Sequence, residues 1–336
     1  MKLKKAALSL ALCAVTASVA IGAAACGSTV RSGDYYTKKS SYKVGICQLV
    51  QHPALDAATK GFMDMLKEKV EAAGKTVTFD EQNASGENTV CTTIVNNFVA
   101  ADYDLILANA TAALQAAANA TLKIPVLGTS ITDYASALNL TGWNGTVGGN
   151  ISGTSDLAPL DKQADIFTDL LPDAKKVGIL YCSAEPNSKY QADTIKPYLE
   201  AKGITVTYYS FTDSNDIATV LNGLKNKVDA LYIPTDNTAA NNTALIDSIC
   251  RPARIPIVAG EEGICGGCGI GTLSISYRSL GEKTGEMAAE ILLEGKLVSD
   301  MPVRYADATT YKYNAAICTE LGITVPQNYE AIAVSE

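Results

Sequence analysis

Residues 43–46 read Lys-Val-Gly-Ile, and residues 176–179 read Lys-Val-Gly-Ile again. Three further segments of the first half return, in the same order, in the second half. The returning pairs are residues 71–79 with 200–208, 104–111 with 229–236, and 123–128 with 254–260. Any chain that alternates buried strands with helices has some internal likeness, but four matches in one order favour a duplicated lobe. Two similar lobes in one chain suggest a cleft between them for a small molecule.

Short apolar runs rich in strand-forming residues alternate with segments whose apolar residues recur at helical spacing. The expected strands are Tyr42–Val50, Thr76–Phe79, Leu105–Ala108, Val126–Gly128, Lys176–Tyr181, Thr205–Tyr209, Leu231–Ile233, Ile257–Ala259 and Thr272–Ser276. The expected helices are Asp56–Ala73, Val90–Ala101, Ala112–Ala120, Tyr190–Lys202, Ile217–Leu224, Thr238–Ile249 and Leu280–Leu293. Strict alternation implies a parallel sheet covered on both faces. We therefore predict an α/β protein of two doubly wound parallel-sheet lobes.

No long Pro-rich or Ser-rich linker separates the two halves, so we expect a hinge of adjacent crossovers. The crossovers are placed near Asn150–Asp156, Ser274–Tyr277 and Ser299–Pro302. This predicts one lobe from residues 42–153 with 276–299, and a second from residues 154–275 with 300–336.

The composition limits the possible functions. The chain has 336 residues, of which 47% are hydrophobic and 18% are charged, which is enough for two sizeable cores. The formal net charge is −8 and no basic run is present, so a nucleic-acid partner is not expected. An enzyme is not expected either, because the chain has one His, no Gly-x-Ser-x-Gly motif and no P-loop. Glu261 and Glu262 could form an acid–base pair, but adjacent carboxylates are more often solvated or capping groups.

The N-terminus resembles an export signal. Lys2, Lys4 and Lys5 precede an uncharged apolar run, which ends in small residues directly before Cys26. This pattern is similar to a bacterial lipoprotein signal, which implies that residues 1–25 are removed and that Cys26 carries a lipid. Residues 26–41 are polar and are predicted to form a flexible tether. We expect an exported protein anchored to the outer face of the cell membrane, the alternative being an uncleaved membrane-spanning helix.

Seven cysteines follow Cys26 in the sequence. Their odd number and irregular spacing are not those of a disulfide framework. Cys265-Gly-Gly-Cys268 has the spacing of a redox or metal pair. No second pair completes a zinc site, so neither a metal nor a cofactor is predicted. A local disulfide and a plain Gly-rich loop both remain possible for residues 260–271.

Polar side chains gather after the predicted strands, where open α/β sheets bind their ligands. The candidate ligand-binding residues are Gln48, Leu49, Val50, Ala110, Thr111, Thr129 and Asp133 in the first half, and Asn187, Ser188, Asp236, Asn237 and Glu261 in the second. Several of these residues would also be good helix N-caps. A capping role alone would not explain why such groups follow corresponding strands in both lobes.

The segment Gly45-Ile-Cys-Gln-Leu-Val-Gln-His-Pro-Ala-Leu-Asp56 resembles the opening of solute-binding proteins of a group of ABC importers, which includes tryptophan- and tyrosine-binding members. The likeness continues, in order, through Ala110-Thr111, Thr132-Asp133, Leu140-Thr-Gly142, Ser183-Ala-Glu-Pro-Asn-Ser188, Pro234-Thr-Asp-Asn237, Tyr277-Arg-Ser-Leu-Gly281 and Leu321-Gly-Ile-Thr-Val-Pro326. The resemblance implies a type I periplasmic-binding-protein fold, in which two lobes joined by three hinge crossovers close on a solute. It also implies an ABC permease with its ATPase as partner, and we expect the protein itself to be a monomer.

Some residues depart from the pattern of that group. Gln51 stands where Glu is more frequent, and Ala112 and Tyr134 stand where Pro is frequent. These positions lie in the expected binding loops, so the identity of the ligand stays open.

The expected ligand is a free amino acid with an aromatic side chain. In this hypothesis Thr111 and neighbouring N–H groups receive the carboxylate, and Asp236 pairs with the ammonium group. Gln48, Leu49 and Val50 line the side-chain pocket. Asp133 and Asn187 close the cleft from either lobe. The alternatives are a ligand sensor that feeds a membrane receptor, or an importer component for a sugar or a nucleoside.

Overall fold

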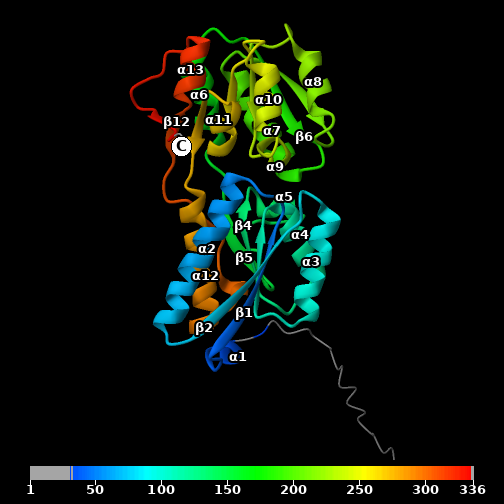
Figure 1. The fold of residues 1–336 in the computed structure, drawn as a ribbon, viewed down its shortest axis with the longest axis vertical. Coiled ribbons are helices and arrows are strands. Elements are labelled where there is room, and N and C mark those ends of the chain that lie inside the picture. The colour runs from blue at the N-terminus through cyan, green and yellow to red at the C-terminus, as the bar shows by residue number, and fades with distance from the viewer. Residues whose placement is uncertain (1–30, 32, 334–336) are drawn as a thin grey trace, which may run out of the picture.

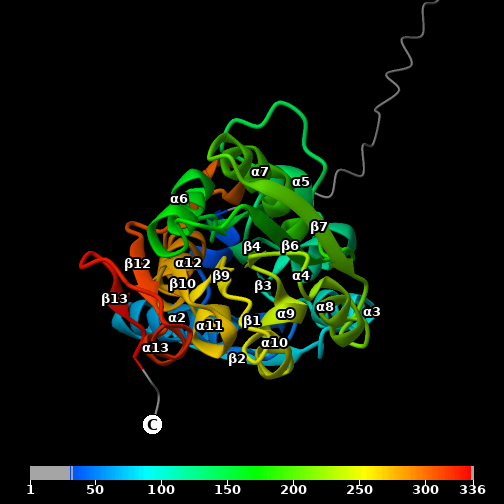
Figure 2. The same cartoon turned by 90° about the horizontal axis from the view of Figure 1, so that it is seen from above.

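The computed structural model describes residue 31 and residues 33–333. The predicted signal peptide and Cys26 lie outside the described residues. Two sheets form two lobes, with the six-stranded sheet in the lower lobe of Figure 1 and the seven-stranded sheet in the upper lobe. Figure 2 shows the second lobe stacked over the first.

The first lobe holds a sheet of order β11-β5-β4-β3-β1-β2, whose strand pairs are all parallel. Its strands are β1 (Ser41–Gln48), β2 (Thr76–Asn83), β3 (Leu105–Asn109), β4 (Val126–Ile131), β5 (Ile151–Ser155) and β11 (Arg304–Tyr305). Its helices are α1 (Gly33–Thr37), α2 (Pro53–Ala72), α3 (Asn88–Ala100), α4 (Thr111–Ala120), α5 (Tyr134–Ala137) and α12 (Tyr277–Glu294). One face of the sheet packs on α2 and α12, and the other packs on α3 and α4.

The second lobe holds a sheet of order β13-β12-β10-β9-β8-β6-β7, in which only the β10–β12 pair is antiparallel. Its strands are β6 (Lys176–Cys182), β7 (Thr205–Phe211), β8 (Ala230–Ile233), β9 (Ile257–Ala259), β10 (Gly271–Ser274), β12 (Thr310–Tyr313) and β13 (Glu330–Ala331). Its helices are α6 (Leu160–Leu170), α7 (Pro186–Ala201), α8 (Ile217–Leu224), α9 (Asn237–Ala240), α10 (Thr243–Cys250), α11 (Glu262–Cys268) and α13 (Ala315–Leu321). A short 3-10 helix, η1 (Val298–Asp300), precedes β11.

The two sheets share the strand order that the sequence repeat predicts, because β5-β4-β3-β1-β2 corresponds to β10-β9-β8-β6-β7. The repeated Lys-Val-Gly-Ile segments are β1 and β6, the second strand from one edge of each sheet. A side chain at Gly45 would lie 2.5 Å from the Phe98 ring, and one at Gly178 would lie 2.8 Å from Leu231. The repeated glycine therefore gives a large apolar neighbour room to pack on the strand.

Three predictions about local structure are wrong. The helix expected over Thr238–Ile249 is two helices, α9 and α10, separated at Asn242. The loop expected over residues 260–271 contains α11, because Glu261 caps a helix despite the glycines within it. Residues 33–37 of the expected tether form α1, which packs Tyr36 into the first lobe with 1% of its surface exposed.

The chain crosses between the sheets after Ser155 in β5, between β10 and α12, and after Tyr305 in β11. The boundaries expected at residues 153, 275 and 299 stay predictions. Helix α12 follows the second crossing and packs along α2.

The packing of α2 against α12 depends on glycines at the crossing. A Cβ at Gly281 would overlap the Ala58 carbonyl oxygen of α2, and a Cβ at Gly61 would overlap the Arg278 carbonyl oxygen of α12. Two helix backbones approach this closely only where no side chain separates them.

We therefore expect Gly281→Ala to lower the free energy of unfolding by about 1–3 kcal/mol, because the added methyl group forces α2 and α12 apart. The matched control is Gly223→Ala on the exposed face of α8, where a Cβ meets no atom within 4 Å. That control should gain up to about 1 kcal/mol from helix propensity. Urea unfolding measures both, and equal stabilities would contradict the close-packing account.

Candidate functional site

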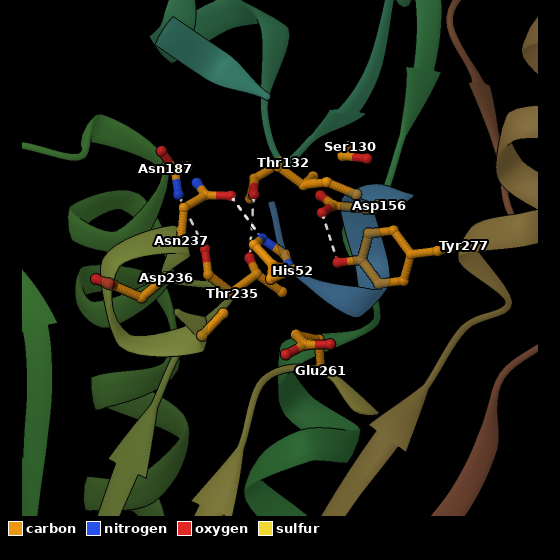
Figure 3. A pocket seen from close by; sticks show the side chains of 12 residues that line it. His52, Ser130, Thr132, Asp156, Asn187, Thr235, Asp236, Asn237, Glu261 and Tyr277 are labelled. Atoms are coloured by element: carbon orange, nitrogen blue, oxygen red, sulfur yellow. Dashed lines mark hydrogen bonds between the residues drawn. The ribbon is translucent and has the colours of Figure 1, made fainter. Parts of the chain in front are cut away.

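A small cavity lies between the lobes, where the carboxyl ends of strands from both sheets meet (Figure 3). Its volume of about 10 Å³ is close to the space of a single water molecule. Residues of both lobes and the first residue of α12, Tyr277, line the cavity. The first lobe and the crossover after β5 contribute His52, Leu55, Ser130, Thr132 and Asp156, and the second lobe contributes Asn187, Thr235, Asp236, Asn237, Ala240 and Glu261.

Asp156 follows the last residue of β5 and is 5% exposed. The Tyr277 hydroxyl donates a hydrogen bond of 2.8 Å to its Oδ2, which joins two of the crossovers between the lobes. Its other oxygen, Oδ1, is buried without a hydrogen-bond partner among the described residues. Burial raises the pKa of the Asp156 carboxyl, and the Tyr277 hydrogen bond offsets part of that rise.

Two further polar atoms on the wall of the cavity are buried without a partner in the described part of the chain, His52 Nδ1 and Ser130 Oγ. Burial lowers the pKa of His52, which favours the neutral ring. Ser130, the last residue but one of β4, has a φ of 56°, a left-handed conformation that is uncommon for a residue with a side chain. Buried polar atoms without partners are costly, so these positions are suited to a ligand that supplies them.

Asp236 lies on the same wall, but its oxygens already have partners. Oδ2 accepts the Cys182 N–H at 2.6 Å, and Oδ1 accepts the Ala239 N–H at 2.8 Å to cap α9. Burial and the neighbouring Glu185 raise the pKa of Asp236 to about 8, although both N–H bonds act in the opposite direction.

Glu261 is the third acid on the wall. Its carboxylate caps α11 by accepting the N–H groups of Gly263 and Ile264. Burial raises its pKa to about 7, and the nearby Asp156 adds to the rise. The cavity therefore concentrates carboxyl groups, and no Lys or Arg is among the described residues that line it.

Glu185 organises the segment at the start of α9, and the sequence analysis did not select it. Its carboxylate accepts the N–H groups of Asn237 and Thr238 at 2.9 and 2.8 Å. It also accepts the Asn237 side-chain N–H at 2.7 Å and the Thr238 hydroxyl at 2.8 Å. These bonds fix which end of the Asn237 amide faces the cavity.

Hydrogen bonds join the two lobes across the cavity. His52 Nε2 lies 3.3 Å from Asn237 Oδ1, and the hydroxyl oxygens of Thr132 and Thr235 lie 3.3 Å apart. The Gln191 side-chain amide donates to Thr132 Oγ1 at 3.1 Å. The structure is therefore a closed arrangement of the lobes.

A larger groove of about 350 Å³ lies beside the cavity and shares Asn187 and Asn237 with it. The first lobe contributes Leu49, Val50, Ser85, Gly86, Glu87, Asn88, Thr89, Ala112 and Gln115 to this groove. The second lobe contributes Cys182, Ala184, Glu185, Pro186, Asn187, Thr212, Asp213, Ser214, Asn237, Thr238, Asn241 and Asn242.

The structure thus brings six of the twelve candidate residues to these two hollows. Asn187, Asp236, Asn237 and Glu261 line the cavity, and Leu49 and Val50 line the groove together with Asn187 and Asn237. Their proposed ligand contacts stay predictions.

The other six candidates line neither hollow. Gln48 donates to Val50 O and to Asp56, Thr129 faces Thr154 inside the sheet, and Asp133 caps α5. Ala110 and Thr111 lie at the start of α4, where Ala110 has a φ of 87°. Ser188 is fully buried beside Asn187.

Asp156, Ser130 and Tyr277 are cavity residues that the sequence analysis did not select. The run of residues 151–155, expected as part of a crossover, is the strand β5. Reading this run as β5 would have placed Asp156 at a strand end, where ligand-binding residues are expected.

The Cys265–Cys268 pair consists of buried free thiols within α11, so the local disulfide is not formed. Burial raises the pKa of both thiols. Within residues 33–333, no group of three or more His, Cys, Asp or Glu side chains is arranged to hold a metal ion. No described helix is long and apolar enough to cross a bilayer.

Comparison with known proteins identifies the family. A model of the ABC transporter substrate binding protein family matches residues 43–335. A tyrosine-binding protein from Clostridioides difficile is 38% identical over 271 residues, which cover 81% of this chain and 78% of that protein.

Two solved structures are similar over most of the chain. A domain from Streptococcus pneumonia in complex with L-Trp matches with a TM-score of 0.80 and 34% identity, covering 86% of this chain and 97% of that one. A ligand-free, open substrate-binding protein with adhesive properties from Clostridium difficile matches with a TM-score of 0.66 and 37% identity, covering 88% and 100%. The lower TM-score against the open structure agrees with the closed arrangement of the lobes. The fold is that of type I periplasmic binding proteins, and the chain belongs to the family of ABC transporter substrate-binding proteins.

Proposed function

We propose that the protein binds a free aromatic amino acid, tyrosine or tryptophan, between its lobes and delivers it to an ABC permease with its ATPase. The names of the relatives support this ligand class, since one is a tyrosine-binding protein and another was solved with L-Trp. In this proposal the protein works as a monomer outside the cytoplasm, held at the membrane by a lipid on Cys26.

The observation that carries the proposal is a set of buried acceptors without partners. Asn237 donates through its amide nitrogen to Glu185, so its Oδ1 faces His52 and accepts a hydrogen from Nε2. In the neutral ring Nδ1 is then an acceptor. Asp156 Oδ1 and Ser130 Oγ are further acceptors on the same wall. An ammonium group, with three N–H donors and a positive charge, is complementary to this set.

Asp156, rather than Asp236, is therefore our proposed partner of the ammonium group. Both oxygens of Asp236 accept backbone N–H groups within its own lobe, which assigns it to building the loop before α9. Glu261 adds negative charge nearby.

The rest of the ligand would occupy the adjoining groove. Leu49 and Val50 provide an apolar wall for an aromatic ring. Ala112 and Gln115 bring the start of α4 to the groove, so its free N–H groups are available to the ligand carboxylate. The closed cavity is too small for an amino acid, so the lobes part to admit the ligand and close around it.

Isothermal titration of the purified protein tests the ligand class. We expect heat on addition of tyrosine or tryptophan, with none from glucose or adenosine. Binding of a sugar or nucleoside without binding of either amino acid would overturn the proposal.

Asp156→Asn should weaken tyrosine or tryptophan binding roughly 10- to 100-fold, because a charge-assisted hydrogen bond in a buried site is lost. Asp236→Asn is the matched comparison, since it replaces another buried carboxyl group on the same wall. It should lower the melting temperature and change affinity less. The reverse ranking of the two affinities would assign the ammonium group to Asp236.

Affinity should also depend on pH. Glu261 has a pKa raised to about 7, so it gains negative charge as pH rises through neutrality, while the ligand ammonium stays charged. Binding measured at pH 6 should be up to about tenfold weaker than at pH 8 if it follows the ionised fraction of Glu261. Asp236, whose pKa is raised to about 8, titrates in the same range, so Glu261→Gln should reduce this dependence without abolishing it. An unchanged slope in that variant would exclude Glu261 as a source.

A further inference from the structure

Gln191 connects the two lobes without lining the ligand cavity. It lies on α7 of the second lobe and is 1% exposed. Its side-chain nitrogen donates to Thr132 Oγ1 of the first lobe at 3.1 Å and also to Thr235 Oγ1. Its carbonyl oxygen accepts the Thr235 N–H at 3.3 Å. With the contact between the two hydroxyls, these three side chains form a closed triangle across the cleft.

The triangle is built from protein groups alone. Thr132 follows β4 in the first lobe, and Thr235 follows β8 in the second. The Gln191 side-chain nitrogen donates to both hydroxyl oxygens at once. The bonds to Thr235 lie within the second lobe and orient the Gln191 amide, and the bond to Thr132 crosses between the lobes. Because every partner of Gln191 belongs to the protein, the bond to Thr132 stabilises closure whichever ligand is bound.

We propose that Gln191 is a positioning residue that latches the lobes, and that it sets the closed fraction and the lifetime of the complex but not the choice of ligand. The statement about lifetime rests on the proposed function, whereas the statement about the closed fraction concerns the free protein. A ligand that binds only the closed form has an apparent affinity proportional to the closed fraction. Removing the latch therefore weakens all ligands by one common factor.

The control for this proposal is another buried glutamine in the same lobe. Gln163 is also 1% exposed, and it donates to Gly260 O and accepts from the Tyr232 hydroxyl. Both partners belong to the second lobe. Replacing Gln163 removes a similar number of buried hydrogen bonds without removing a contact between lobes.

The first measurement is small-angle scattering of the ligand-free parent, Gln191→Met and Gln163→Met. We expect a larger radius of gyration for Gln191→Met than for the parent, and no increase for Gln163→Met. Equal radii for the parent and Gln191→Met would overturn the proposal. If Gln191→Met does not fold, Thr132→Val removes the same hydrogen bond from the other lobe and should give the same increase.

The second measurement is the dissociation rate of tyrosine and of tryptophan by stopped-flow fluorescence. Gln191→Met should release both ligands roughly tenfold faster, as expected for the loss of one or two buried hydrogen bonds. The ratio of the two affinities should stay within about twofold of the parent ratio. A changed ratio would assign Gln191 to ligand selection instead. If the parent binds neither amino acid, the proposed function fails while the scattering result still decides the latch.

Discussion

A buried carboxylate loses its hydrogen bonds to water and needs donors from the protein or a ligand in their place. The cleft of this protein buries three carboxyl groups at less than 6% exposure, those of Asp156, Asp236 and Glu261. Backbone N–H groups compensate Asp236 and Glu261 in part, from the end of β6 and the start of α9 for Asp236 and from the start of α11 for Glu261. Asp156 has one hydroxyl donor on one oxygen and none on the other within the described chain. Closure of the lobes around an ammonium group would resolve this imbalance, which connects the electrostatics of the site to its motion.

The duplicated fold places these groups where the ligand can reach both lobes. Strands β3 and β8 correspond in the two lobes. Strand β3 ends at Asn109, and β8 ends at Ile233, shortly before Asp236. Asn109 donates to Leu55 O and Thr59 inside the first lobe, and Asp236 accepts the Cys182 N–H inside the second. Each residue therefore braces the loop beside its own strand. Asp156, which follows β5 where the chain leaves the first lobe, has no such partner for its Oδ1 among the described residues.

Much of the fold could be predicted from the sequence because buried parallel strands leave a strong local pattern. The segments around Gly45 and Gly178 are typical, since apolar residues surround a glycine whose missing side chain admits a neighbour. Helix α11 could not be predicted in this way. Its glycines disfavour a helix, and it forms because Glu261 caps its first turn and Cys265 and Cys268 pack into the core.

The site was less predictable than the fold, for a physical reason. Leu49, Asn187 and Asn237 could be selected from their positions after strands. Whether a polar residue serves the ligand or the protein depends on which partners it finds in three dimensions. Asp236 and Asp156 are both acids after a strand, and only the hydrogen-bond partners distinguish them.

The most direct test of this account is a crystal structure of the protein with tyrosine or tryptophan bound. The account predicts that the ligand ammonium nitrogen lies within hydrogen-bond distance of Asp156 Oδ1, with the lobes closed and Gln191 bonded to Thr132. An ammonium group held by Asp236, with Asp156 directed away from the ligand, would contradict it.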